Sequence, residues 1–421
     1  MTAPPLEGRP LWRDRRFVTY WSGETVSQFG DRVTELALPL IAVVSLHATP
    51  TQMGLLTAAV WAPNLVSLLV GAWVDHQRLK RRLLIAADLL RALTLVSIPI
   101  AYFLGPLTLG HLFAVALIAG FGQVLFQTAY QPFFVALVRR DQYVEANSLL
   151  STTRSASFIA GPAVGGGLIQ LLSGPVTLVV DALSFVMSAL MISRVEVIER
   201  EVDTADTAPL LRRALDGMRF VLRHPYLKAS LGCATTVNFF SFMSGALLLL
   251  FASRALGLSA GLIGLAFGIG ATGGLLGAFL ASRVARWIGV GWTVVVGSVV
   301  FCAPTALVPL AHGPTWAKGG VLAIVEFLAS LGIMCFDINL NSLQTAVTPD
   351  DMRSRVAGAF STINYGIRPL GAITGGLLGQ YVGVGPTMII AAIGGSLGFL
   401  WLLPSPIPGV RTVDDLEPVR R

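Results

Sequence analysis

The sequence predicts an all-α integral membrane protein with about twelve transmembrane helices, arranged as two pseudo-symmetric six-helix bundles. Of its 421 residues, 54% are hydrophobic and only 13% are charged, a balance that ordinary soluble domains of this length do not have. Apolar runs of about twenty residues, each long enough to cross a bilayer, recur along the whole chain. Short phrases of the first half also return in the second half.

The apolar runs divide the chain in order. The candidate spans are 17–46, 52–74, 83–104, 109–138, 147–172, 175–193, 227–253, 259–282, 289–311, 316–346, 354–380 and 385–403. We therefore expect an N-terminal tail, a first bundle, a linker, a second bundle and a C-terminal tail. Their bounds are 1–16, 17–193, 194–226, 227–403 and 404–421.

The first apolar run carries a stripe of polar side chains. Four of them recur at i, i+4, i+7 and i+11: Glu24, Gln28, Asp31 and Glu35. These positions share one helix face and rise roughly 16 Å along it. A charged side chain at the centre of a lone spanning helix costs about 2.5–3.5 kcal/mol. We therefore expect this face to line a polar cavity that other helices complete.

Basic residues are distributed unevenly between the loops. They cluster before the first span, after the second and fourth spans, in the linker and in the C-terminal tail, and are sparse in the alternate loops. This positive-inside pattern predicts a multi-pass protein of the cell membrane with both termini in the cytoplasm. The net charge of +7 then reflects topology and attraction to anionic lipid headgroups, and nucleic acid is not an expected partner.

Matching phrases indicate that the two halves repeat one unit. Gly71-Ala-Trp-Val-Asp75 returns as Gly277-Ala-Phe-Leu-Ala281. Gly174-Pro175 returns as Gly385-Pro386. Repeats of this kind are typical of transporters, which place their binding site near the midplane between two halves that move against each other.

The linker begins with acidic residues and continues with an amphipathic stretch. Apolar residues recur there at helical spacing from Leu211 to Leu222, with arginines between them. The pattern predicts a helix on the inner membrane surface that ends at His224-Pro225. We expect a structural tether; a regulatory role stays open.

Two motifs connect this pattern to a known family. Gly71-x-x-x-Asp75 precedes a basic cluster after the second span, and Gly161-Pro162-x-x-Gly165-Gly166 lies in the fifth. Together with about twelve spans in two repeated halves, these motifs make the sequence resemble the major facilitator superfamily over essentially the whole chain. Phrases such as Ala37-Leu38-Pro39-Leu40 and Arg368-Pro369-Leu370-Gly371 resemble its branch of enterobactin-type siderophore exporters and macrolide-efflux pumps.

The resemblance implies the major facilitator fold and roles for both motifs. The pattern of Gly161, Pro162, Gly165 and Gly166 is an antiporter motif in that family, and it also suits a kinked, closely packed helix. The loop after the second span is implied to be a cytoplasmic gate, although His76 replaces a common arginine.

Charged residues of that loop and of the nearby helices are the gate candidates. They are Asp75, Arg81, Arg82, Asp88, Arg91 and Arg154. Asp75 is expected to lie at a helix N-terminus or to pair with Arg81 or Arg82. Asp88 and Arg91, at i and i+3, are expected to form a structural pair.

In the resembled fold, spans 1, 4, 7 and 10 line the central cavity, and most polar side chains of this chain's spans lie there. The substrate-cavity candidates are Glu24, Gln28, Gln123, Gln127, Gln131, Asn238, Phe239, Phe242, Asn341 and Arg368. For the amides, hydrogen bonding between helices is an equally good interpretation. Amides and phenyl rings with few charges suit a bulky amphipathic ligand better than a sugar or a small ion.

Acids within the spans are the candidates for proton coupling. They are Asp31, Glu35, Glu326 and Asp337. A carboxylate can take up and release a proton as its surroundings change, so a site open alternately to each side can carry protons. We expect no catalytic residue, no metal site and no cofactor, since the sequence has neither a nucleophile–base set nor metal-ligand spacing.

The sequence therefore predicts a proton-coupled antiporter that exports an amphipathic small molecule, such as a siderophore, a macrolide or another antibiotic, by alternating access. The direction of transport rests on the resemblance. A proton-coupled importer of a small nutrient is the alternative, and a non-transporting membrane receptor is a further one. The expected partners are the substrate, protons and lipid, and the expected state is a monomer.

The gate hypothesis predicts the effect of Asp75→Asn. Loss of the charge weakens the charge-assisted hydrogen bond expected for Asp75, so transport into membrane vesicles should fall several-fold. The amount of protein in the membrane, measured by immunoblot, should stay the same. Unchanged transport would contradict a gating role for Asp75.

Overall fold

The computed structural model describes residues 11–77, 79–105, 107–197 and 210–416. The predictions made for the start of the N-terminal tail, for most of the acidic part of the linker and for the end of the C-terminal tail lie outside these residues. All regular secondary structure in the described part of the chain is helical, as predicted.

The helices form two compact units, which are described separately. The first unit comprises Met1–Leu38 and Val66–Ala205. Its helices are α1 (Arg15–Leu40), α3 (Ser67–Asp75), α4 (Lys80–Leu104), α5 (Leu109–Leu137), α6 (Tyr143–Leu172) and α7 (Gly174–Ser193). Phenyl and phenol rings fill much of its core, with Phe17, Tyr20 and Phe133 almost completely buried.

The second unit comprises Pro39–Leu65 and Asp206–Arg421. Its helices are α2 (Pro50–Trp61), α8 (Leu210–Arg223), α9 (Pro225–Leu250), α10 (Ala260–Ile288), α11 (Val290–Cys302), α12 (Thr315–Val347), α13 (Arg353–Tyr381) and α14 (Val384–Ser396). Residues 39–65, which the sequence pattern assigns to the first bundle, thus pack with the second half of the chain.

Ten helical segments of the described residues are long and apolar enough to cross a membrane. One of them, Pro50–Val74, runs through α2 and α3. The helices α1 and α13 contain 26 and 29 residues but are not among the ten. Polar and charged side chains, such as Glu24 and Asp31 in α1, interrupt their apolar sequence. The prediction of about twelve spans is therefore not confirmed as a count.

Backbone geometry at the helix ends supports the internal repeat. Six of the seven described residues with positive φ, a region that disfavours most side chains, form three pairs separated by about half the chain, and Gly289 (88°) has no such partner. The pairs are His47 (50°) with Gly257 (69°), Gly105 (95°) with Gly313 (101°), and Ser173 (76°) with Gly383 (103°). A turn of π-helix at Ile41–Ser45 likewise recurs at Phe251–Ala255. The corners between helices are therefore built in the same way in both halves.

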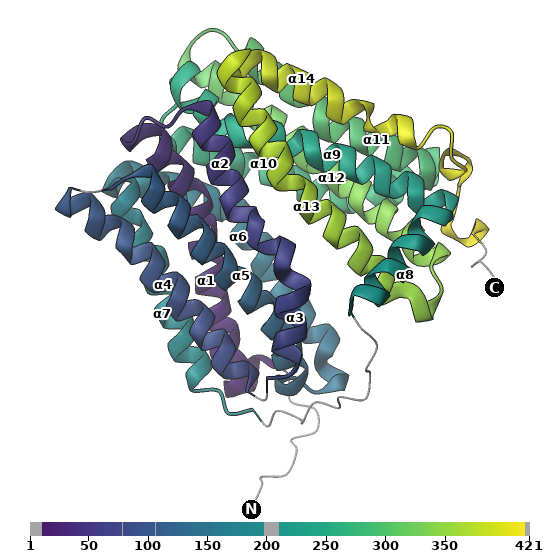
Figure 1. Cartoon of the computed structure of the whole chain (residues 1–421), viewed down its shortest axis with the longest axis horizontal. Coiled ribbons are helices and arrows are strands. Elements are labelled where there is room, and N and C mark those ends of the chain that lie inside the picture. The colour runs from purple at the N-terminus through teal and green to yellow at the C-terminus, as the bar shows by residue number, and fades with distance from the viewer. Residues whose placement is uncertain (1–10, 78, 106, 198–209, 417–421) are drawn as a thin grey trace, which may run out of the picture. The chain divides into compact units, whose positions relative to one another are not determined.

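Glycines bring the helices of the second unit into close contact. The helix α13 packs along both α2 and α9 (Figure 1). A Cβ atom at Gly371 or Gly375 of α13 would collide with the backbone carbonyl of Phe239 or Met243 of α9. On the other side, a Cβ atom at Gly54 of α2 would collide with the backbone of α13. These positions need glycine because two backbones meet there.

The predicted amphipathic helix of the linker is present as α8. Its residue Gly217 lies against the backbone carbonyl of Arg355 in α13. Val221 is buried in a cluster that includes Val356 and Phe360 of the same helix. The apolar face of α8 is therefore covered at least in part by protein, and not only by the membrane surface as the sequence suggested.

The segment after α14 folds back onto α11. The backbone N–H groups of Val290 and Gly291 donate to the carbonyls of Arg411 and Val410, at 3.1 and 3.0 Å. Ile407 and Val410 are buried in the same apolar cluster as Val294. The first turn of α11 thus finds acceptors for N–H groups that a helix cannot satisfy internally.

The close packing predicts that Gly375→Ala destabilises the protein, because its Cβ atom has no room against α9. We expect a loss of about 1–3 kcal/mol, measured as a lower unfolding temperature of the purified protein. Gly358→Ala, on the same helix, is the control, since nothing lies within 4 Å of its added Cβ atom. Equal unfolding temperatures for the two variants would contradict the packing described above.

Candidate functional site

The polar stripe of α1 is held in local pairs. Gln28 Nε2 donates to Glu24 Oε1 at 2.8 Å. Arg32 Nη1 donates to Glu35 Oε2 at 2.6 Å, although 60% of the Glu35 side chain is exposed. Because Glu35 has its countercharge on the next turn of its own helix, its negative charge is already compensated within α1.

Asp31 forms the ion pair that connects α1 to α4. Its carboxylate accepts from Nη2 of Arg91, and the Arg91 guanidinium lies 3.9 Å from the ring centre of Phe185 in α7. Arg91 is only 7% exposed, and Gly122 of α5 leaves space for its side chain. The predicted pair of Arg91 with Asp88 is thus replaced by a contact between helices, because the guanidinium points to α1 instead of along α4.

Two further acids of the first unit are completely buried. Asp181 of α7 accepts from the hydroxyls of Thr34 and Ser184. Asp88 of α4 has no hydrogen bond of good geometry to either carboxylate oxygen, although the hydroxyl of Ser188 and the guanidinium of Arg91 are near it. Neither acid forms an ion pair among the described residues. Asp181 is recognisable in the sequence as an acid within an apolar span, but the sequence assigned it no role; in the structure Gly30 leaves space for it.

The antiporter-type motif packs α6 against α1. A Cβ atom at Gly161 would overlap the side chain of Arg32, and one at Gly165 would press on Val33. Gly166 is also buried, and Pro162 lies inside the helix without breaking it. The close-packing interpretation of this motif is therefore confirmed.

The remaining gate candidates are Asp75, Arg81, Arg82 and Arg154. Arg81 donates from Nη1 to the carbonyl of Val195 at 2.9 Å, whereas Arg82 and Arg154 are exposed. Asp75 is the last residue of α3, and its side chain lies outside the described part of the structure.

In the second unit, an arginine lies among aromatic rings. The guanidinium of Arg368 in α13 is 4.4 Å from the ring centre of Trp61, 4.5 Å from Tyr365 and 5.0 Å from Phe242. Its Nε donates to Oδ1 of Asn238 at 3.0 Å. Three of these residues were cavity candidates. Trp61 was missed because only the packing of α2 against α13 brings it to Arg368, whereas Tyr365, three residues before Arg368 on the same helix, could have been found from its spacing.

The remaining candidates lie on α5, α9 and α12. Gln127 and Gln131 are exposed, and Gln123 has a buried side-chain oxygen without a partner. The ring of Phe239 packs edge-on against Phe240 at 5.1 Å. Glu326 and Asp337 are half-buried on α12 and make no ion pair with described residues.

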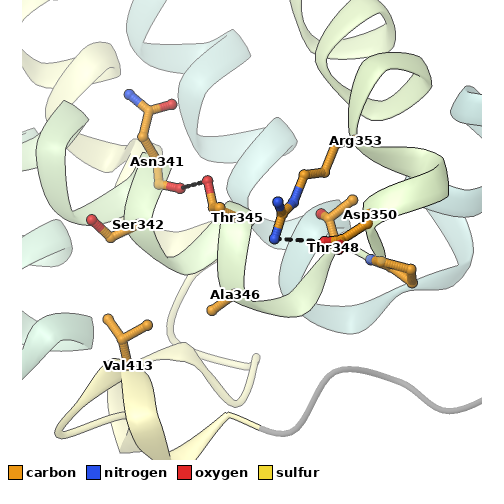
Figure 2. Close-up of a pocket in the computed structure, with 9 residues that line it drawn as sticks. Asn341, Ser342, Thr345, Ala346, Thr348, Asp350, Arg353 and Val413 are labelled. Atoms are coloured by element: carbon orange, nitrogen blue, oxygen red, sulfur yellow. Dashed lines mark hydrogen bonds and ion pairs between the residues drawn. The ribbon is translucent and has the colours of Figure 1, made fainter. Parts of the chain in front are cut away.

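An open pocket of about 800 Å³ lies at the end of α12. Figure 2 shows the ion pair of Asp350 with Arg353, 2.9 Å long, on one side and Val413 on the other. Asn341, one of the predicted substrate-cavity residues, lines this pocket. Because Asp350 and Arg353 neutralise each other's charge, the pocket does not by itself indicate a class of ligand.

Comparison with known proteins agrees with this architecture. The sequence profile of the Major Facilitator Superfamily matches residues 20–372 and, separately, residues 231–420. The chain belongs to the Major Facilitator Superfamily. The predicted resemblance is thereby confirmed: this is a multi-pass membrane transporter of that superfamily and not an enzyme.

Similar proteins of this superfamily include transporters of several kinds. The uncharacterized transporter YfiS of Bacillus subtilis is 24% identical, over 91% of each chain. The multidrug efflux pump Tap of Mycolicibacterium fortuitum is 25% identical, over 86% of this chain and 89% of the pump. The crystal structure of the nucleoside transporter NupG superposes with a TM-score of 0.75 at 14% identity, covering 92% of this chain and 99% of that one.

The Asp31–Arg91 pair predicts a specific rescue. Arg91→Met should cost about 3–5 kcal/mol, because it leaves Asp31 without its countercharge, and the unfolding temperature should fall. The double variant Asp31→Asn with Arg91→Met should recover most of that loss. Arg154→Met, at an exposed position, serves as the control. A double variant as unstable as Arg91→Met alone would contradict a stabilising pair.

Proposed function

We propose that the protein is a proton-coupled exporter of amphipathic small molecules. Similarity to the multidrug efflux pump Tap over 86% of this chain supports export. The mixture of aromatic rings, amides and a few charges supports an amphipathic ligand. The likeness to NupG, at 14% identity, concerns the fold alone and does not favour nucleosides.

Proton coupling rests on one observation, the completely buried carboxylate of Asp88 without a hydrogen bond. A buried ionised carboxylate that lacks a partner is costly, and binding a proton removes that cost. Asp31 and Glu35 each have an arginine already. Asp88 is therefore the strongest candidate for the proton carrier, with Asp181 as the second.

Arg91 offers a route by which a proton on Asp88 changes the helices around it. It lies one turn from Asp88 along α4 and is paired with Asp31 of α1. While Asp88 is protonated, Arg91 pairs with Asp31 alone. When the proton leaves, two carboxylates compete for one guanidinium, which weakens the link between α1 and α4. This competition couples the protonation of Asp88 to the packing of two helices.

We further propose that both termini lie in the cytoplasm and that the protein acts as a monomer in the cell membrane. The distribution of basic loops supports the orientation. A reporter fused to either end that is active only outside the cytoplasm should remain inactive.

Everted membrane vesicles with an imposed proton gradient test the function. An exported amphipathic dye should accumulate in them, and Asp88→Asn should reduce that accumulation at least tenfold, because the amide cannot release a proton. Asp216→Asn, outside the spans, should transport normally.

Other outcomes would contradict the proposal. Full gradient-driven transport by Asp88→Asn would reject this acid as the carrier, and loss of transport only in Asp31→Asn would assign the role to Asp31. Uptake of substrate by energised intact cells would indicate an importer. Binding without any flux would indicate a receptor.

A further inference from the structure

The surroundings of Arg368 differ from those of the arginines in the first unit. Arg32 and Arg91 also lie near phenyl rings, at 5.3 Å from Phe158 and 3.9 Å from Phe185, and each is paired with a carboxylate. Arg368 makes no ion pair within 4.0 Å of its nitrogens among the described residues. Its positive charge is therefore not neutralised by direct contact.

The hydrogen-bonding capacity of Arg368 is also largely unused. A guanidinium carries five N–H donors, and only the Nε–H has a partner, the side-chain oxygen of Asn238. The other donors, on Nη1 and Nη2, bond to no described residue. These two nitrogen atoms are not fully buried. They are consequently accessible to a molecule that approaches the ring cluster.

Aromatic rings hold this guanidinium in place. Trp61 stacks with Tyr365 at 6.1 Å and meets Phe242 edge-on at 5.1 Å, so the three rings support one another. They belong to α2, α13 and α9, three helices that pack closely within the second unit. The rings provide flat apolar surface beside the unpaired donors, and the attraction between cation and ring partly compensates the buried charge.

We propose that Arg368 anchors a binding site for an amphipathic anion in the second unit. The carboxylate or other anionic group of the ligand pairs with the free N–H groups, and its flat apolar part packs on Trp61 and Tyr365. The proposal names the substrate class of the exporter proposed above and rests on that function for its biological role.

The positive charge of Arg368 favours an anionic over a cationic ligand at this cluster. Aromatic rings often bind cationic ligands, but here the protein's own guanidinium already occupies the space between them. A second cation would meet repulsion from Arg368. Asp337 of α12 influences Arg368 electrostatically but stays outside ion-pair distance, so it leaves the donors free. An anion supplies the contact that Arg368 lacks.

Three compounds on one scaffold test the proposal: 1-naphthoate, 1-naphthamide and 1-naphthylmethylammonium. Binding is measured calorimetrically on the purified full chain in nanodiscs, without a proton gradient. Naphthoate should bind at least tenfold more tightly than the ammonium compound, with the amide between them. No binding of naphthoate up to millimolar concentration, or tighter binding of the ammonium compound, would overturn the proposal.

Variants at Asn238 separate a ligand site from a purely structural cluster. Asn238→Asp places a carboxylate at the position that already contacts Arg368, so it should compete with the ligand and weaken naphthoate binding at least tenfold. Asn238→Ala removes the contact without adding charge and should therefore weaken naphthoate binding several-fold less than Asn238→Asp does. Equal effects of both variants on naphthoate would reject Arg368 as the anchor.

Variants of Arg368 complete the test. Arg368→Gln should reduce the affinity for naphthoate to that for naphthamide, and Arg368→Lys should retain part of the difference, since it keeps the charge but loses the planar fork. If naphthoate binds as expected and is not transported in vesicles, the export function fails and the binding site stands. If export occurs without a preference for anions, the proposed binding site fails and the export function stands.

Discussion

Charges buried within membrane helices must be compensated, and in the first unit the contact of Asp31 with Arg91 does this between two helices. A charge left alone near the bilayer centre costs about 2.5–3.5 kcal/mol, which exceeds the worth of most single contacts between helices. Away from the helix ends of this unit there are five acids (Glu24, Asp31, Glu35, Asp88 and Asp181) but three arginines (Arg32, Arg91 and Arg154), so the compensation is incomplete. Asp88 and Asp181 are the completely buried acids without an ion pair, and the proposed proton coupling arises from that imbalance.

Glycines also help these helices to accommodate charged residues, because they leave room for the larger side chains beside them. In the first unit, Gly30 lies against Asp181, Gly122 against Arg91 and Gly161 against Arg32. In the second unit Gly270 lies against Glu326. A larger residue at position 30 would displace the carboxylate of Asp181, and one at position 122 or 161 would displace the aliphatic stem of an arginine. One at position 270 would meet Cβ and the backbone of Glu326. Small residues in these spans therefore have two roles, since they bring backbones together and they shape the spaces in which charges sit.

The sequence predicted the fold well because composition, helical periodicity and repeated phrases are local signals. The polar stripe of α1, the close packing around Gly161 and the helix α8 were all visible in it. The partners of the charged residues were not, because they lie on other helices. Arg91 was expected to pair along α4, yet it reaches Asp31, and no spacing in the sequence connects Trp61 to Arg368. Such contacts depend on how the helices pack, and no periodicity reports that.

The return of the chain from α14 to α11 has a consequence for biosynthesis. The N–H groups of Val290 and Gly291 find their acceptors in Val410 and Arg411, which a ribosome adds about 120 residues later. At translation rates of about 5–20 residues per second, this delay lasts roughly 6–24 s. During it, the nascent second unit has an open helix end that water or the insertion machinery must occupy. A ribosome that stalls before residue 410 would therefore leave a nearly full-length chain with an unfinished core.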